Sequence, residues 1–180
     1  MATSYPLSYI SYLSEFHATR DYFECHELLE EYWKAHQGEE LTGTWHGLIQ
    51  IAVGCYHHRR GNRGGALKMW TSALQRLSDH HLVQLGLDGT ELLAELQRRR
   101  DALEEDAAFP YSDMDLPIRD PKLQEACLAE CAKQGWRWGL PSKEAGEDVI
   151  HRHLTRDRSE VVGARAQAAL ERQRSIGRSE

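Results

Sequence analysis

Side chains that bind metals or transfer protons stand at helical spacing in the first part of the chain. His26, Glu30 and Trp33 occupy positions i, i+4 and i+7, and an α-helix with ~3.6 residues per turn places them on one face. An imidazole and a carboxylate one turn apart can share a proton or a divalent cation. A neighbouring indole would limit the access of water. The pattern indicates a polar site but identifies no reaction.

A second group of polar residues lies on the next predicted helix, over about residues 44–60. His46, Gln50 and either His57 or His58 follow one side of this helix, whose other positions are largely apolar. Polar groups inside an apolar helix need hydrogen-bond partners. We therefore expect the two helices to face each other, with Gln50 as a member of a shared polar network.

A metal site needs more than the two ligands of the first helix, because a catalytic zinc usually has three protein ligands and a water. His57 is the predicted third ligand beside His26 and Glu30, and His46 and His58 stay open as alternatives. Zinc, iron or manganese is the expected cofactor. Three further residues are candidates for ligand binding, and the last of them is also a candidate helix cap: Trp33, Gln50 and Asn62.

Three interpretations of these residues stay open. The histidine and the carboxylate form a structural hydrogen-bond network that fixes helix register, they hold a divalent metal, or they line a metal-free pocket for a small ligand. A metal would support hydrolysis with Glu27 or Glu30 as base. The rival class is a non-enzymatic helical interaction module. The sequence leaves open whether the protein is an enzyme.

Composition is that of an ordinary globular protein, with 41% hydrophobic and 28% charged residues in 180. No apolar run approaches the ~18 residues of a membrane span, and the first residues lack the pattern of a secretion signal. We expect a cytoplasmic protein without membrane contact.

The four cysteines are Cys25, Cys55, Cys127 and Cys131, and none of them forms a C-x-x-C pair. We expect them to be small buried residues in a reducing compartment.

Charge is unevenly distributed and argues against nucleic acid as a partner. Residues 1–109 carry the entire net charge of −6, while residues 110–180 are balanced. An acidic body does not attract a phosphate backbone.

The arginine-rich tail also carries apolar positions at helical spacing, namely Ile150, Leu154 and Val161. We expect these to dock on the acidic bundle, within one chain or across a homodimer, and we expect His151 and His153 to be solvated.

The apolar residues recur with a helical period nearly throughout, and no alternating β-pattern occurs. We predict an all-α fold, an irregular helical bundle with a helical C-terminal extension. The bundle covers residues 1–108, a linker covers 109–120, and the extension covers 121–180 with a disordered end. The predicted helices cover residues 8–19, 22–36, 44–60, 121–134 and 148–174. A further helix includes residues 66–77, and another begins after Asp88 and runs through Leu103.

Local signals mark several helix boundaries. Asp21 and Asp88 are each followed three residues later by glutamate, the capping-box pattern, and Thr44 is a candidate cap of the third helix. Gly47 and Gly54 lie two turns apart inside that helix, where each costs up to ~1 kcal/mol relative to alanine. A close approach of another helix is the expected reason for them.

Three segments in order resemble a known family. They are residues 22–33 with the pattern H-x-x-x-E-x-x-W, residues 47–52 and residues 60–66. This arrangement is similar to the bacterial and archaeal "domain of unknown function 309" family, and residues 150–162 resemble the C-terminal extension of its longer Bacillus-type members. The resemblance implies an all-helical fold and a metal-binding motif filled by His26, Glu30 and Trp33. It implies no established activity.

Overall fold

The structure, a computed structural model, describes residues 4–155 and consists of α-helices, most of them joined by short connections, with longer irregular segments before and after α7. The all-α prediction is confirmed. The helices are α1 (Leu7–Ser14), α2 (Tyr22–Ala35), α3 (Thr42–Arg59), α4 (Arg63–Arg76), α5 (Asp79–Gln84), α6 (Gly89–Glu105), α7 (Pro121–Gln134), α8 (Glu147–Ile150) and α9 (Arg152–Thr155). A π-helical turn, Glu15–Thr19, prolongs α1, and a 3₁₀ turn, Ser142–Glu144, precedes α8.

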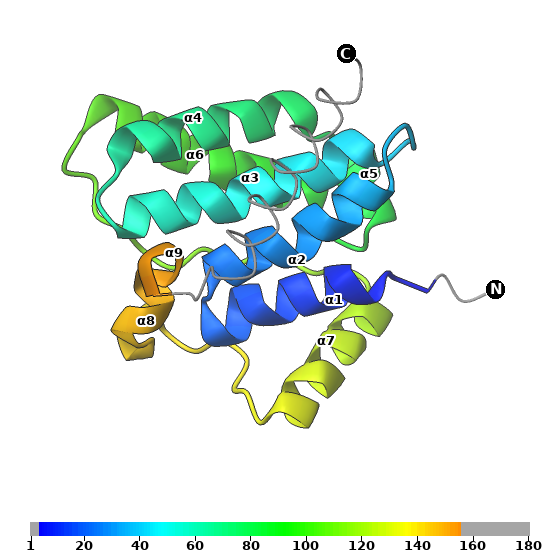
Figure 1. The fold of residues 1–180 in the computed structure, drawn as a ribbon. Helices are drawn as coiled ribbons and strands as arrows, with labels where there is room; N and C mark the ends of the chain where they lie inside the picture. The colour runs from blue at the N-terminus through cyan, green and yellow to red at the C-terminus, as the bar shows by residue number, and fades with distance from the viewer. Residues whose placement is uncertain (1–3, 156–180) are drawn as a thin grey trace, which may run out of the picture.

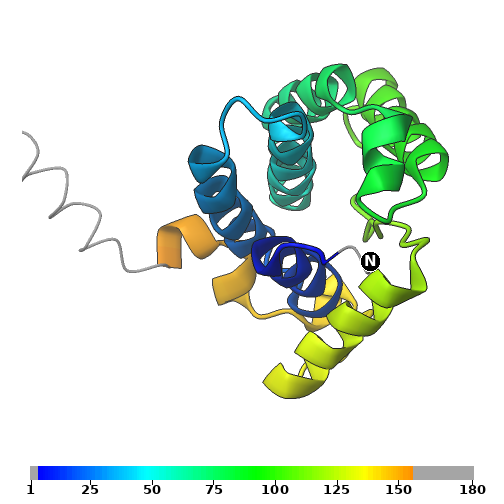
Figure 2. The same cartoon turned by 90° about the vertical axis from the view of Figure 1, so that its right-hand side faces the viewer.

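Successive helices pack side by side. Helix α1 lies against α2, α2 against α3, and α3 against α4, which in turn contacts α6 (Figure 1). Viewed from the side in Figure 2, these helices form an arc, and α7 returns to pack on α1. No helix among residues 4–155 is long and apolar enough to cross a membrane.

Short polar side chains begin several of the helices, as local sequence signals predict. Asp21 accepts a hydrogen bond from the backbone N–H of Glu24, and Asp88 accepts one from the N–H of Glu91. Asn62 does the same for Gly65 at the start of α4. Each bond satisfies a backbone donor that has no partner inside its helix.

Two of the three glycines inside α3, Gly47 and Gly54, let neighbouring side chains approach its backbone. A Cβ on Gly54 would lie 2.4 Å from Cδ1 of Trp70 on α4, and one on Gly47 would lie 2.6 Å from Cδ2 of Leu77. Both distances are too short for a side chain to be added without displacement. The expected close approach is confirmed, and it explains the tight packing of α4 on α3.

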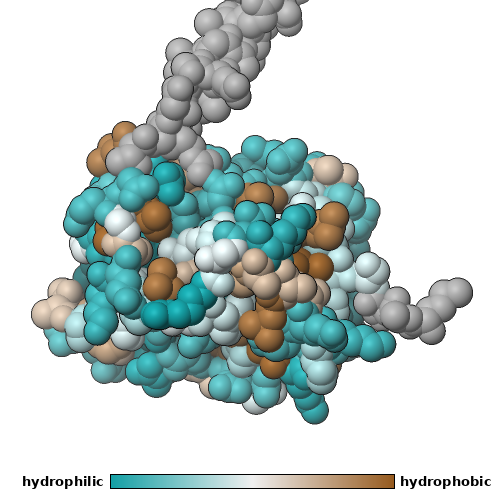
Figure 3. Space-filling model, turned by 90° about the horizontal axis from the view of Figure 1, so that it is seen from below, coloured by the Kyte–Doolittle hydropathy of each residue, from teal (hydrophilic) through white to brown (hydrophobic). Residues whose placement is uncertain are grey.

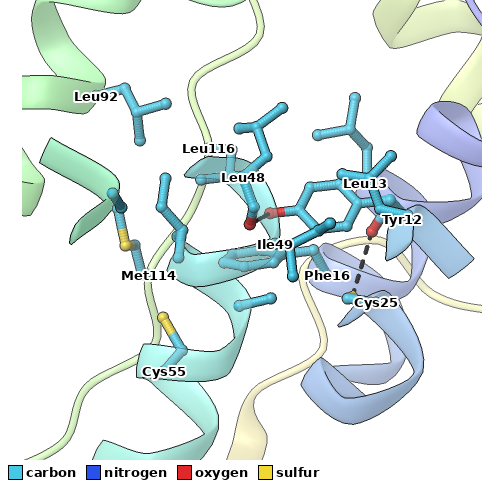
Figure 4. Close-up of a cluster of buried hydrophobic side chains, with 14 of the residues drawn as sticks. Tyr12, Leu13, Phe16, Cys25, Leu48, Ile49, Cys55, Leu92, Met114 and Leu116 are labelled. Carbon is cyan, nitrogen blue, oxygen red and sulfur yellow. Dashed lines mark hydrogen bonds between the residues drawn. The ribbon is translucent and has the colours of Figure 1, made fainter. Parts of the chain in front are cut away.

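The segment predicted as a linker, residues 109–120, enters the core. Met114 and Leu116 are buried in the same hydrophobic cluster as Leu48 and Ile49 of α3 (Figure 4). The backbone N–H of Leu116 donates to Nε2 of His17 at 2.9 Å. This extended stretch therefore stabilises the fold through apolar burial and hydrogen bonding, although its prolines and aspartates show no period.

A buried arginine ties the irregular segments to the end of α1. Arg20 is 3% exposed and has φ 55°, and it donates to the carbonyl oxygens of Met114 and Leu140 and to the carboxylate of Asp115. Several hydrogen bonds to one guanidinium compensate for its burial. Nothing in the local sequence predicts this role.

Three local predictions were wrong. Helix α3 begins at Thr42, so Thr44 is buried inside the helix instead of capping it. The last helix is interrupted at His151, between α8 and α9, and its predicted remainder lies outside the described residues, as do Val161 and the expected disordered end. Helix α5 was not expected, because its six residues are too few to show the helical repeat of apolar positions.

The exposed apolar side chains are few and scattered. Among the described residues, the large exposed ones are Leu7, Val83, Leu128 and Leu154. Seen from below, hydrophobic residues form separate patches between hydrophilic ones (Figure 3).

All four cysteines are buried and unpaired, as expected from their spacing.

Candidate functional site

Helices α2 and α3 enclose a hollow of about 250 Å³ that we call the Glu30 hollow. Its polar walls come from His26 and Glu30 of α2 and from His46 and Gln50 of α3. Apolar and aromatic side chains complete it, namely Trp33, Ile49, Val53 and Met69. The predicted facing of the two helices is confirmed. The i, i+4 spacing on each helix places both polar pairs on the shared interface.

Glu30 lies between two basic side chains. Its Oε2 is 2.7 Å from Nε2 of His26, and its Oε1 is 2.7 Å from Nζ of Lys34. Burial disfavours the carboxylate, but the hydrogen bond from Lys34 and the charge of His26 outweigh burial and lower the pKa of Glu30. Glu30 is therefore an ionised carboxylate at neutral pH, available as a hydrogen-bond acceptor or a metal ligand.

The opposite wall, formed by α3, holds a histidine and one buried polar atom without a partner, and Trp33 of α2 adds a second such atom. The ring of His46 lies 4.4 Å from that of Trp33. Burial, and then the charge of Arg76, lower the pKa of His46, which favours the neutral imidazole that metals bind. Oε1 of Gln50 and Nε1 of Trp33 make no hydrogen bond. A buried polar atom without a partner costs about 1–3 kcal/mol, so these two require an explanation.

A second hollow of about 260 Å³ adjoins the first, and we call it the Arg60 hollow. His26 and Val53 line both hollows. His57 and Arg60 from the end of α3 line only the second, together with His153 of α9. The two hollows thus adjoin along α2 and α3, with His26 and Val53 common to both.

The structure does not bring His57 to Glu30. The donor atoms of His26, Glu30 and His57 do not all lie within 4.8 Å of one another. His57 lies two turns beyond Gln50 and instead contacts Nδ2 of Asn62, with a separation of 3.2 Å from Nδ1. His58 is buried on another side of α3, where its Nε2 lies 3.0 Å from the carbonyl oxygen of Phe109.

Of the three histidines considered as third ligand, His46 is the one that shares the hollow with Glu30. Its ring nitrogens do not lie within 4.8 Å of both other donors in the present rotamer. Asn62 lines neither hollow and serves as the cap of α4. Trp33 and Gln50, the other candidate ligand-binding residues, both lie in the Glu30 hollow.

A further cluster was not anticipated from the sequence. Among the described residues, only Glu40, His80 and His81 bring three donor atoms of His, Cys, Asp or Glu within 4.8 Å of one another. Glu40 lies in the loop after α2, and the two histidines lie on the short helix α5. The adjacent histidines were the available signal, but their meeting with Glu40 depends on the tertiary fold.

The two histidines of the extension were expected to be solvated, but both are only partly exposed and make hydrogen bonds with the bundle. Arg60 donates through Nε to Nδ1 of His151 at 2.9 Å. The hydroxyl of Tyr56 is hydrogen-bonded to Nδ1 of His153. Leu154, which was expected to dock, is 68% exposed. Polar contacts therefore hold α9 on the bundle.

Comparison with known proteins places the chain in a family. The family model described as "Domain of unknown function (DUF309)" matches residues 9–69. The uncharacterized protein YpuF of Bacillus subtilis (strain 168) is 44% identical over 173 residues, which are 95% of this chain and 98% of that protein. The chain belongs to the DUF309 family. An uncharacterized protein of Aquifex aeolicus (strain VF5) is 36% identical over 44 residues, 24% of this chain and 13% of that protein. No solved structure matches.

The segment matched by the DUF309 model contains every residue that lines the Glu30 hollow, from His26 to Met69. The Arg60 hollow differs, because His153 lies outside that segment. The similarity to YpuF extends over nearly the whole chain and so includes the extension. The first hollow thus belongs to the shared DUF309 segment, whereas the second also depends on the extension.

Proposed function

We propose that the Glu30 hollow binds a divalent metal ion through His26, Glu30 and His46, with Oε1 of Gln50 as a further oxygen donor. The observation that carries the proposal is that all four side chains line one hollow while the Gln50 oxygen has no partner there. Two imidazoles, a carboxylate and an amide oxygen suit zinc, iron or manganese.

The contacts around Glu30 are compatible with such a role. The His26 and Glu30 side chains are 28% and 29% exposed, so an ion can reach them. An ion would replace the hydrogen bond between these two residues. Lys34 can keep its contact with the second carboxylate oxygen and orient the ligand, as outer partners of metal ligands commonly do. His46 would leave the face of Trp33 to complete the set.

A metal at this position would supply a Lewis acid and lower the pKa of a coordinated water, which is the chemistry of metal-dependent hydrolysis. The surrounding residues set what can approach. Trp33 and Met69 form an apolar rim, and the small volume admits a compact group only. We therefore propose hydrolysis as the activity that this set would support.

The test is metal binding by the full chain purified without a histidine tag. We expect about one zinc, iron or manganese per chain by elemental analysis, and saturable Zn²⁺ binding by calorimetry after chelation. His26→Ala, Glu30→Gln and His46→Ala should each lose it, while His57→Ala should retain it. All proteins carry His80→Ala and His81→Ala, so that the cluster with Glu40 does not contribute.

The competing function is an interaction module whose polar network is structural. It is favoured by one observation: both oxygens of Glu30 are already hydrogen-bonded by His26 and Lys34. Metal-free protein whose melting temperature does not change when Zn²⁺, Mn²⁺ or Fe²⁺ is added would support this function and overturn the metal site. Equal Zn²⁺ binding by wild type and Glu30→Gln would overturn it as well.

A further inference from the structure

The Arg60 hollow collects basic groups without an acidic one. Arg60 and the imidazoles of His26, His57 and His153 line it, and neither Asp nor Glu is among its lining residues. The protein as a whole is acidic, with a net charge of −6. A cavity whose ionisable walls are all basic attracts an anion, because low-dielectric walls concentrate the field of the charges.

The hydrogen bonds of Arg60 go to imidazoles. Its Nε donates to Nδ1 of His151 at 2.9 Å, and its Nη1 lies 3.3 Å from Nε2 of His153. A guanidinium cannot accept a hydrogen bond, so both ring nitrogens are the acceptors. These two bonds leave most of its five N–H groups unassigned and bring no negative charge to the cation. Within residues 4–155 no salt bridge neutralises Arg60.

The pKa of His57 reflects the same excess of positive charge in the Arg60 hollow. Burial, and then the nearby charges of Arg60 and His153, lower the pKa of His57. An anion between these side chains would reverse the last two effects. When an anion replaces the contact between Arg60 and His153, the imidazoles can also donate hydrogen bonds to its oxygens, as Arg60 does. Charge-assisted bonds of this kind are the strong ones.

The remaining walls are aromatic and apolar, and they set the size of the ligand. Tyr22, Phe23 and Val53 line the hollow, with the Phe23 ring 5.5 Å from that of His26, and Tyr56 presents its hydroxyl at the contact with His153. A volume of about 260 Å³ lies just below the usual range of sites for small organic ligands. It accommodates a phosphate group with a compact organic part against the ring of Phe23.

One wall belongs to the C-terminal extension. His153 projects from α9, and Arg152 beside it forms a salt bridge of 2.9 Å with the buried carboxylate of Asp21. The site is complete only when α9 is docked. A ligand that binds His153 and Arg60 together would therefore also hold the extension in place.

We propose that the Arg60 hollow binds the phosphate group of a small organic molecule, with Arg60, His57 and His153 as the phosphate-binding residues and α9 as a wall closed by the ligand. This proposal goes beyond the metal site and does not depend on it. The two sites share His26 but are separated by their other residues: Glu30 and His46 line only the first, and Arg60 and His57 line only the second.

The experiment measures binding of inorganic phosphate and of phenyl phosphate to the full chain by calorimetry, at an ionic strength held constant with chloride. We expect phenyl phosphate to bind more tightly than phosphate, and Arg60→Gln to weaken both at least tenfold. His57→Gln should weaken them less. Arg137→Gln is the matched control, because it makes the same charge change at an exposed site. Circular dichroism verifies that each variant is folded.

A second measurement follows α9 directly. Phenyl phosphate should slow trypsin cleavage after Arg152 in the wild type and leave that rate unchanged in Arg60→Gln. Glu30→Gln should bind phosphate normally, which separates this site from the metal site. Three results would overturn the proposal: no binding above that of chloride, equal binding by Arg60→Gln, or tight binding of benzoate without any binding of phosphate.

Discussion

Arg152 and Asp21, 131 residues apart in the sequence, form a salt bridge in which Nη2 lies 2.9 Å from Oδ2. Asp21 is also the N-cap of α2 through its other oxygen. One buried carboxylate therefore begins the helix that carries His26 and Glu30 and holds the extension that carries His153. The two hollows are linked through this residue as well as through His26.

Asp21→Asn should release α9 while leaving α2 intact. Asparagine caps helices as well as aspartate does, but it removes the charge that holds Arg152. We expect trypsin to cleave after Arg152 several times faster than in the wild type, with little change in helix content. Arg137→Gln, which breaks an exposed pair with Glu144, should not change the rate. A cleavage rate equal to the wild type in Asp21→Asn would contradict the docking role of the pair.

Removing Glu30 should cost stability that depends on pH. The pair with His26 is partly exposed, so we expect Glu30→Ala to lower the free energy of unfolding by about 1 kcal/mol at pH 7. Since the pKa of Glu30 is lowered in the folded state, its stabilisation is present above the ordinary carboxyl pKa and lost as pH falls through the lowered value.

Urea titrations of wild type and Glu30→Gln at pH 7, 5 and 3 test this dependence. The difference between the two proteins should shrink towards pH 3. Lys34→Ala is the control for the second contact of the carboxylate and should show a smaller difference at pH 7. A difference that is constant from pH 7 to pH 3 would mean that Glu30 is not stabilised as a carboxylate.

His17 should make the fold sensitive to acid. Burial lowers the pKa of His17 well below its usual value, and its Nε2 accepts a hydrogen bond from the N–H of Leu116. The unfolded chain takes up a proton near pH 6.5, but the folded protein does not, so stability falls as pH decreases below that value. This group alone should cost about 2 kcal/mol between pH 7 and pH 5.

The measurement is the free energy of unfolding of wild type and His17→Gln at several pH values from 7 to 5. The variant should be less stable at pH 7, because it loses the shape of the ring stacked on Trp138 at 4.3 Å. It should nevertheless show a shallower loss towards pH 5. Parallel curves for the two proteins would exclude His17 as the acid-sensitive group.

Gly54→Ala should disturb the packing of α4 on α3. The added methyl would lie 2.3 Å from Nε1 of Trp70, which is fully buried and cannot move away. We expect a loss of about 1–3 kcal/mol or more. Gly43→Ala in the same helix is the matched control, since nothing lies within 4 Å of its Cβ. It should be neutral or stabilising by up to about 1 kcal/mol. Thermal melts of both variants decide the comparison.

The sequence by itself determined the helices and most of their boundaries. The caps formed by Asp21, Asn62, Asp88 and Asp120 are local, because each side chain bonds a backbone N–H two or three residues away. The helical spacing of apolar residues is also a local signal, because it depends only on residues within one segment. The pairing of His26 with Glu30 also follows from spacing within one helix. Gly47 and Gly54 indicated a close neighbour of α3 but did not identify it as Trp70 and Leu77.

Only the tertiary structure decided which polar residues meet. His46, His57 and His58 all lie on α3, and the way that helix is rotated against α2 places His46 beside Glu30, His57 beside Arg60 and His58 against Phe109. The segment 109–120 has no period, yet it fills the core through Met114 and Leu116. His153 reaches Tyr56 across 97 residues of sequence. Spacing within a helix fixes neighbours on that helix, but contacts between elements depend on how all of them pack at once, and no local pattern encodes that.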